Sequence, residues 1–256
     1  MTRPSPRRLL ALESATDWIS VALFDGDRTA ILREHEGARQ HSAALVSVVD
    51  ATLRESGLGL RDVDAMAISV GPGSFTSLRI GLATLKGLCF GRDIPVVGVS
   101  TLETMALAVL EGRPGGGADV EVLALLDARR GDWYAGAWRR ADAPGQVPVE
   151  TLVSGLYAPR LLVEDLPRRV MGVSPEPSGW REVFERAGLR FEACVEGVDA
   201  RPRADWVGRL ALRRFARGEV GSASNLSARY LRRAQAEVQR TGQDVEMGET
   251  GRSERR

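Results

Sequence analysis

Lysine and histidine are scarce in this chain of 256 residues. Lys86 is the only lysine, and His35 and His41 are the only histidines. Imidazole is the commonest side-chain ligand of zinc and related metals, so two histidines this far apart offer no histidine-based centre. We therefore expect no metal ion and no other cofactor.

Cysteines and long apolar runs are also rare. Cys89 and Cys194 have no C-x-x-C spacing, a pattern typical of reduced, buried thiols in a cytosolic protein. Glu13 interrupts the apolar run that begins at Leu9, so we expect no signal peptide and no membrane span. The net charge of +1 and the 43% hydrophobic content are ordinary for a soluble globular protein. Together these features predict a cytoplasmic protein.

A glycine-rich segment, residues 71–81, is the most informative motif that is present. It lies between an apolar run at 65–70 and a helical pattern at 78–90. Its glycines permit a tight turn, Ser74 or Thr76 can cap the helix, and the helix N-terminus suits an anion. No Gly-Lys-Ser/Thr closes the segment, and the third glycine of a dinucleotide fingerprint is missing. Anion binding and a purely geometric strand-to-helix turn both remain open.

Hydrophobic periodicity predicts two similar halves, which glycine- and proline-rich residues 112–117 separate. In each half the predicted order is βββαβαβα, with helices to cover both faces of a largely parallel sheet. We therefore predict an α/β fold with one lobe at 1–111 and a second, divergent lobe at 118–218. A C-terminal helix is expected at 226–239, packing back on one lobe, and a disordered tail at 240–256.

Doubled βββαβαβα lobes resemble the actin-like ATPase (ASKHA) superfamily, and five short motifs narrow the resemblance. They are Leu-Glu-Ser-Ala-Thr at 12–16, Arg-Gln-His-Ser at 39–42, the glycine-rich segment, Asp-Ala-Arg-Arg-Gly-Asp-Trp-Tyr at 127–134 and Tyr-Leu-Arg at 230–232. Together they are similar to the TsaB family, the non-catalytic partner subunits of bacterial tRNA threonylcarbamoyladenosine (t6A) modification. The chain departs from the family pattern where Glu13-Ser14 replaces Asp-Thr, Ser77 replaces a glycine and Ala228 replaces a proline.

The resemblance implies a subunit that is not itself an enzyme. It implies binding to a catalytic TsaD-like subunit through first-lobe helices, help in recruiting a TsaE-like ATPase, indirect contact with tRNA, and dimerisation when alone. The expected partner interface consists of His41, Leu45, Val48, Val49, Leu53, Arg79, Leu82 and Leu85. A vestigial anion or nucleotide site is expected at Glu13, Ser14, Gly71, Gly73, Ser74 and Thr76. Substituting arginine at Val49 or Leu82 is expected to abolish partner binding and leave the fold intact.

Two enzymatic alternatives remain open. An active carbamoyl-transferase or ATPase of the same fold would need, by resemblance to TsaD, a His-x-x-x-His pair where this chain has Thr101 and Met105. A peptidase would need an activated nucleophile, and Ser42 beside His41 is the only adjacent pair. Glu103 is interpreted as part of a capping box rather than as an acid–base residue.

A basic cluster near the C-terminus is a further candidate site. It could contact tRNA phosphates directly, although a solvated helix face is the commoner explanation. Its members are Arg213, Arg214, Arg217, Arg229, Arg232 and Arg233.

Overall fold

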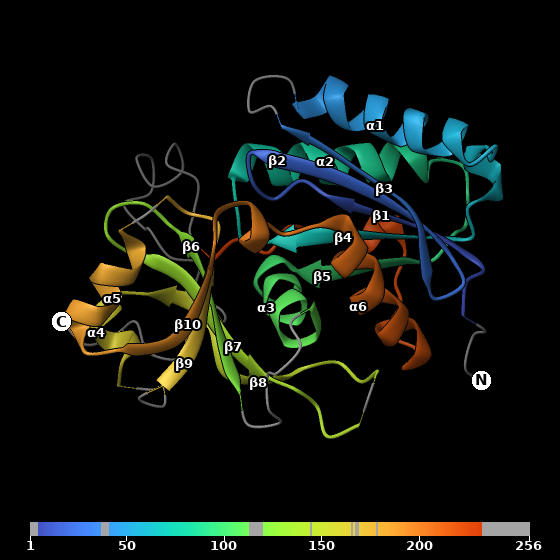
Figure 1. Ribbon diagram of the computed structural model, residues 1–256. Helices are drawn as coiled ribbons and strands as arrows, with labels where there is room; N and C mark the ends of the chain where they lie inside the picture. Colours follow the sequence, from blue (N-terminus) through green and yellow to red (C-terminus); the bar gives the residue numbers. More distant parts are fainter. Residues whose placement is uncertain are drawn as a thin grey trace.

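The computed structural model describes residues 5–36, 41–112, 120–143, 145–164, 166, 169–177 and 179–231. Its strands form two five-stranded sheets, one in each half of the chain (Figure 1). Within the described residues, no helix is both long and apolar enough to cross a lipid bilayer.

The first sheet has the strand order β3-β2-β1-β4-β5. An antiparallel meander comprises β1 (Arg8–Glu13), β2 (Trp18–Asp25) and β3 (Arg28–Glu36). Parallel to β1 run β4 (Ala65–Gly71) and, beside it, β5 (Val96–Ser100). The central strands are almost wholly apolar because helices cover the sheet on both faces.

The second sheet repeats this topology in the order β10-β9-β6-β7-β8. Its strands are β6 (Glu121–Asp127), β7 (Trp133–Arg139), β8 (Val149–Tyr157), β9 (Arg169–Ser174) and β10 (Arg190–Glu196). As in the first sheet, the first three strands are antiparallel and the last two run parallel to the first. The repeat confirms the predicted two-lobed α/β fold of the actin-like type.

Helices join the strands in the predicted order. In the described residues the α-helices are α1 (His41–Glu55), α2 (Phe75–Leu88), α3 (Thr101–Gly112), α4 (Pro159–Leu162), α5 (Trp180–Ala187) and α6 (Ala204–Ala216). Single 3₁₀ turns occupy Leu60–Asp62, Gly197–Ala200 and Ala223–Asn225. Figure 1 shows α1 and α2 together on one face of the first sheet and α6 on the other.

Helix α6 belongs to the first lobe by packing, although it follows the second sheet in sequence. Val207, Leu210 and Phe215 are buried in one cluster with Leu9 and Phe24 of the first sheet. The helix approaches β2 very closely at Gly208, where a Cβ atom would lie 2.1 Å from Cε2 of Phe24. The last helix of the second lobe predicted at 118–218 therefore packs on the first lobe instead.

Helix α3 lies between the two sheets rather than within the first lobe (Figure 1). Leu107 packs in the cluster of the first sheet, whereas Leu102, Met105 and Val109 pack with strand residues of the second. The boundary predicted near residue 112 falls between the strands of the two sheets, whereas α3, which precedes it, packs against both sheets. Sequence periodicity identifies an apolar helix face without identifying the sheet that it covers.

The chain after α6 returns along the first sheet. Gly221 forms a bridge with Val96, and the Arg229 N–H donates a 2.7 Å hydrogen bond to the carbonyl oxygen of Val70. Residues 226–231 have no regular secondary structure, so the helix predicted at 226–239 does not begin here. Backbone groups that bond to β4 and its neighbours are unavailable for a helix. Positions 232–239 and the tail predicted at 240–256 lie outside the described residues.

Candidate functional site

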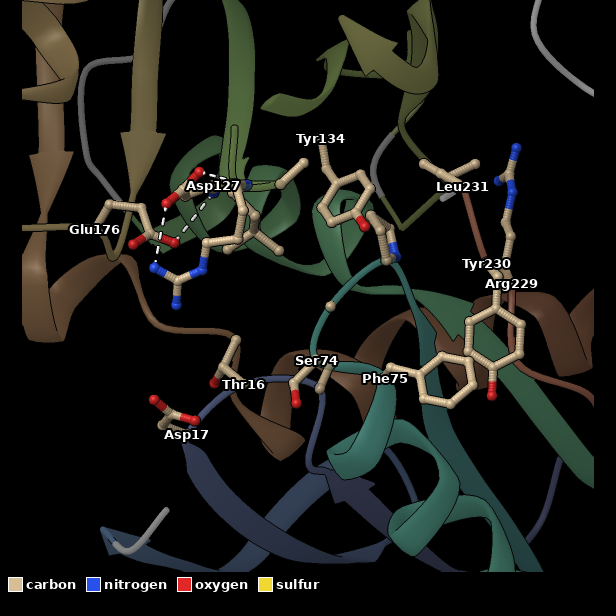
Figure 2. Close-up of a pocket in the computed structure, with 16 residues that line it drawn as sticks. Thr16, Asp17, Ser74, Phe75, Asp127, Tyr134, Glu176, Arg229, Tyr230 and Leu231 are labelled. Atoms are coloured by element: carbon tan, nitrogen blue, oxygen red, sulfur yellow. Dashed lines mark hydrogen bonds and ion pairs between the residues drawn. The ribbon is translucent and has the colours of Figure 1, made fainter. Parts of the chain in front are cut away.

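A cavity of about 370 Å³ lies between the lobes, at the carboxyl ends of the central strands (Figure 2). Five segments line it: the β1–β2 hairpin, the glycine-rich loop, the β6–β7 hairpin, the loop after β9 and the C-terminal segment. Its lining residues are Ala15, Thr16, Asp17, Pro72, Gly73, Ser74, Phe75, Leu126, Asp127, Ala128, Arg129, Tyr134, Glu176, Arg229, Tyr230 and Leu231. Ligands of open α/β sheets bind at such strand ends, so this is the candidate site.

Glu13, the acidic residue expected in this site, does not line the cavity. Its side chain is fully buried, and it accepts a 2.6 Å hydrogen bond from the Ala15 N–H and another from the Ser69 hydroxyl. Burial raises the pKa of Glu13 to about 7, although the hydrogen bonds from Ser69 and from the backbone oppose the shift. The carboxyl group of Glu13 is therefore bonded within the first lobe and does not face the cavity.

The glycine-rich loop is closed by contacts within the chain. Ser74, one of the two caps that the sequence allows, is the N-cap of α2 and accepts a 3.4 Å hydrogen bond from the Ser77 N–H. The Ser74 N–H donates to the Ala15 carbonyl oxygen at 2.8 Å, and a Cβ atom on Gly73 would lie only 2.2 Å from that oxygen. Gly71 has a φ of 116°, and a Cβ atom there would lie 2.8 Å from the Arg229 carbonyl oxygen. The glycines thus permit close packing of backbone on backbone.

The six residues predicted for a vestigial anion site are only partly brought together. Gly73 and Ser74 line the cavity, whereas Glu13 and Gly71 lie behind its wall. Ser14 is buried and its hydroxyl donates to the Ser77 carbonyl oxygen at 3.5 Å. Thr76 is exposed in the first turn of α2, outside the lining.

The second lobe supplies an acidic wall that sequence analysis did not assign to a site. Asp127 accepts a 2.7 Å hydrogen bond from the Arg129 N–H, and its carboxylate lies 3.5 Å from the Arg129 guanidinium. Glu176 accepts a 3.1 Å hydrogen bond from the Asp127 N–H, and burial raises its pKa above the usual value. Figure 2 shows Asp127 and Glu176 together on one side of the cavity, with Tyr230 and Arg229 on the other. The position of Glu176 just after β9 was the available signal.

The positions where a TsaD-like sequence would hold a metal are core positions in this chain. Thr101 is fully buried, and Met105 packs in the cluster between α3 and the second sheet. Among the described residues, no group of three or more His, Cys, Asp or Glu side chains is placed to hold a metal ion. The side chains of His41 and Ser42 lie outside the described residues.

Glu103 forms only half of the predicted capping box. Its N–H donates to the Ser100 hydroxyl at 3.4 Å, but its carboxylate pairs with Arg214 of α6 at 2.5 Å instead of reaching back to the cap. Burial raises the pKa of Glu103 to about 7, while Arg214 opposes the shift. This carboxylate therefore links α3 to α6.

The basic cluster is largely neutralised by acidic neighbours. Arg213 pairs with Glu111 at 2.5 Å, Arg214 with Glu103, and Arg217 with Glu219 at 2.8 Å. Arg229 lines the cavity, and positions 232 and 233 lie outside the described residues. These ion pairs weaken the case for direct phosphate binding.

Most of the predicted partner-interface residues lie in the core of the first lobe. Those buried in one cluster between α1, α2 and the first sheet are Leu45, Val49, Leu53, Leu82 and Leu85, and Val48 packs against it partly buried. The apolar faces of both helices are occupied by the sheet, so they offer no surface to a partner. An arginine at Val49 or Leu82 would place a charge in this core, contrary to the expectation that the fold would stay intact.

The outward faces of α1 and α2 carry other residues. Val46 of α1 is 49% exposed, and Phe90, just after α2, is 89% exposed. The exposed positions on α2 are Thr76, Arg79, Ala83, Lys86 and Gly87. Among the residues predicted for the partner interface whose side chains the structure describes, Arg79 is therefore the exposed one.

Comparisons with known proteins match this chain to two groups of proteins named for tRNA threonylcarbamoyladenosine. Residues 34–147 match the family model of TsaD, tRNA N6-adenosine threonylcarbamoyltransferase. The tRNA threonylcarbamoyladenosine biosynthesis protein TsaB of Escherichia coli (strain K12) is 31% identical over 228 residues, which cover 88% of this chain and 94% of that protein. TsaB of Haemophilus influenzae is 41% identical over 127 residues, 49% of this chain and 51% of the relative. The solved structure of YeaZ from Pseudomonas aeruginosa superposes with a TM-score of 0.75 at 30% identity, covering 88% of this chain and 99% of YeaZ.

Proposed function

Because the chain belongs to the TsaB family of tRNA threonylcarbamoyladenosine biosynthesis proteins, we propose that it serves this pathway as a non-catalytic subunit. In this role it binds and activates a TsaD-like threonylcarbamoyltransferase, and the pair recruits a TsaE-like ATPase. The transfer to tRNA takes place on the TsaD-like subunit, so this chain meets tRNA through the complex. The match of residues 34–147 to the TsaD model supports a common origin of the two subunits.

The inward turn of Glu13 is the observation that carries the non-catalytic assignment. An acidic residue that serves a bound nucleotide or metal has to face the cleft, but this carboxylate is fully buried and bonded to Ala15 and Ser69. The close contact between Gly73 and Ala15 fills the adjacent corner, where a phosphate would lie against the loop. We infer from these contacts that Glu13 and the loop hold the first lobe together rather than bind a reactant.

An active carbamoyl-transferase or ATPase of the same fold is the second candidate, favoured by the TsaD match. Against it stand Thr101 and Met105, which are core residues and lack the imidazoles that a metal site at this place would use. A peptidase is the weakest candidate, because neighbours along a helix such as His41 and Ser42 do not face each other.

We place the contact with the TsaD-like subunit on the outward faces of α1 and α2. These helices pack side by side on the first sheet, and their outer faces carry the exposed Val46 together with the small residues Ala83 and Gly87. A Cβ atom on Gly87 would meet nothing within 4 Å, so a partner helix can approach the backbone closely there. The same surface would serve a homodimer when the partner is missing.

Reconstitution of t6A formation tests the proposed function. Labelled threonine should enter tRNA when this chain is combined with the TsaD-like subunit, the TsaE-like ATPase and the enzyme that supplies the threonylcarbamoyl donor. Omitting this chain should lower the rate at least about tenfold, and the purified chain alone should neither modify tRNA nor hydrolyse ATP. ATP hydrolysis that co-purifies with this chain, and that Asp127→Asn at the cavity abolishes, would establish the enzymatic alternative.

Gly87→Arg tests the proposed interface without disturbing the core. The new side chain points into open space, and arginine favours a helix interior by roughly 0.5–1 kcal/mol over glycine, so the variant should unfold at the same or a higher temperature. Co-elution with the TsaD-like subunit in size-exclusion chromatography should be lost. Leu161→Arg, at a 47% exposed position of α4, is the matched control and should co-elute normally. Normal co-elution of Gly87→Arg would place the interface elsewhere.

A further inference from the structure

Building on the proposed partner contact, we propose that Arg79 is a preorganised carboxylate-binding residue. Together with Lys86 it makes the outer face of α2 specific for an acidic helix of the TsaD-like subunit. Three features of the molecule support this role. Aromatic contacts hold the Arg79 side chain, its terminal nitrogens are left unbonded by the described residues, and α2 carries a net positive charge.

Two aromatic rings fix the guanidinium of Arg79. Its central carbon lies 3.9 Å from the ring centroid of Phe75, one turn earlier on α2. Its Nε donates a 3.2 Å hydrogen bond to the hydroxyl oxygen of Tyr230. The rings of Phe75 and Tyr230 are themselves packed, with centroids 4.7 Å apart, and Figure 2 shows them side by side at the start of α2. An exposed arginine is thus held in one orientation.

The two rings that support this arrangement come from segments far apart in the sequence. Phe75 is the first residue of α2, directly after the Ser74 cap. Tyr230 follows Arg229, whose N–H donates to the Val70 carbonyl oxygen at 2.7 Å and fixes the C-terminal segment against β4. Because both rings are anchored to the first lobe, the conformational entropy of Arg79 is lost on folding rather than on binding.

The two terminal nitrogens of Arg79 remain available. Among the side-chain hydrogen bonds and ion pairs of the described residues, the Arg79 guanidinium takes part only in the hydrogen bond from Nε to Tyr230. A guanidinium that stacks through its face and bonds through Nε presents its paired N–H groups at the opposite edge. That fork matches the two oxygens of a carboxylate, whereas an ammonium group offers only a point charge.

The charges of α2 point to an acidic protein partner. The helix contains Arg79 and Lys86 and no Asp or Glu, and both cations are exposed. They lie seven residues apart, which is two helical turns or about 10 Å. On α1, by contrast, Arg54 is paired with Asp50 at 2.9 Å and adds no net charge. The complement of this face is a helix that carries two carboxylates two turns apart and packs against Ala83 and Gly87.

Nucleic acid fits this surface less well. A phosphate backbone is bound by many cations at once, and α2 offers two. The nearby alternative, the basic cluster, has Arg213, Arg214 and Arg217 in ion pairs. A pair of carboxylates on one protein helix therefore satisfies the surface, whereas a tRNA strand does not.

The test measures the dissociation constant of the full chain and the TsaD-like subunit at 50 and 300 mM NaCl. Arg79→Glu should weaken binding about 100-fold at low salt, and Arg79→Lys about tenfold because it keeps the charge and loses the fork. Tyr230→Phe retains the ring and removes only the hydroxyl, so it should weaken binding about threefold. Arg160→Glu, an equal charge reversal on exposed α4, is the control and should stay within about twofold of wild type. Unfolding temperatures check that each variant is folded.

Three outcomes would overturn the inference. If Arg79→Lys and Tyr230→Phe both bind like wild type, Arg79 does not act as a fixed fork; loss of binding by Gly87→Arg would then leave the proposed function standing. If Arg79→Glu binds the subunit normally but the complex retains less tRNA, the residue contacts phosphate. If the wild-type chain does not bind the subunit at all, the proposed function and the inference fall together.

Discussion

The two lobes end their first strand in the same way and use it differently. Glu13 is the last residue of β1 and Asp127 the last residue of β6. Each carboxylate accepts a hydrogen bond from the backbone N–H two residues later: 2.6 Å from Ala15 in the first lobe and 2.7 Å from Arg129 in the second. Yet Glu13 is fully buried, whereas the Asp127 side chain is 29% exposed and lines the cavity.

The two hairpins thus share one turn geometry, but the carboxyl group is buried inside the lobe in one and faces the cavity in the other. The extra methylene group of Glu13 extends the carboxylate to Ser69 on β4, inside the lobe. The first lobe is thereby closed on its cleft side, with Gly73 packed on Ala15. The second lobe instead turns Asp127 and Glu176 toward the cavity. The second lobe thus adds these two carboxyl groups to the polar lining that Thr16, Asp17 and Ser74 contribute from the first lobe.

Glu13→Gln should give the largest effect, through pH-dependent stability. The folded pKa of Glu13 is raised from 4.5 to about 7 by burial, so between these pH values the folded chain holds a proton that the unfolded chain releases. Stability from this residue is therefore fully present below pH 4.5, falls as the pH rises, and is lost above about 7, a total of about 3 kcal/mol. Glutamine has no proton to lose, so urea unfolding of the variant should show a smaller decline between pH 5 and pH 8.

Asp127→Asn is the matched control in the second lobe. Its carboxylate is partly exposed and lies near Arg129, so the variant should follow the pH profile of wild type more closely than Glu13→Gln does. Equal changes for the two variants would mean that the lobes do not differ in the way proposed. Glu103, whose pKa burial also raises to about 7, is present in both variants and cancels from the comparison.

Gly73→Ala should give the next largest effect. Its Cβ atom would lie 2.2 Å from the Ala15 carbonyl oxygen, a backbone atom, so the loop and the hairpin must separate at a cost of about 2 kcal/mol. Gly131, in the β6–β7 hairpin, has a φ of 85° and no atom within 4 Å of a Cβ, so Gly131→Ala should cost only about 1 kcal/mol from backbone strain. Urea unfolding at one pH measures both. If Gly131→Ala lowered the free energy of unfolding more than Gly73→Ala, the first lobe would not be the one that is closed toward the cavity.

The sequence predicted the fold in good detail because its signals are local. Alternating and helical apolar patterns, with glycine and proline between them, marked nearly all strands and helices in the right order. The partition of helices between sheets was not predictable in this way, because the contact of Gly208 with Phe24 joins segments far apart in sequence. The interface prediction selected the strongest apolar faces, such as that of Leu45 and Val49, and those are the faces that the chain's own sheet buries first.

The site was predicted less well, for a related reason. Ser74 as a helix cap follows from local spacing, and the four-residue spacing of Phe75 and Arg79 on one helix was a readable sign of their contact. The hydrogen bond of Arg79 to Tyr230 spans 151 positions, and no local pattern encodes it. The inward turn of Glu13 depends equally on Ser69, which is contributed by another strand.

The position of α6 on the first sheet determines when the first lobe can complete its folding during synthesis. Residues up to Gly112 emerge from the ribosome first, but one face of their sheet stays uncovered until Ala216 has been synthesised. The first lobe should therefore wait for almost the whole second lobe before it is complete, and residues 1–112 expressed alone would expose Leu9 and Phe24 to solvent. The lobes resemble two copies of one unit, yet the first is completed by a helix that follows the second in the sequence.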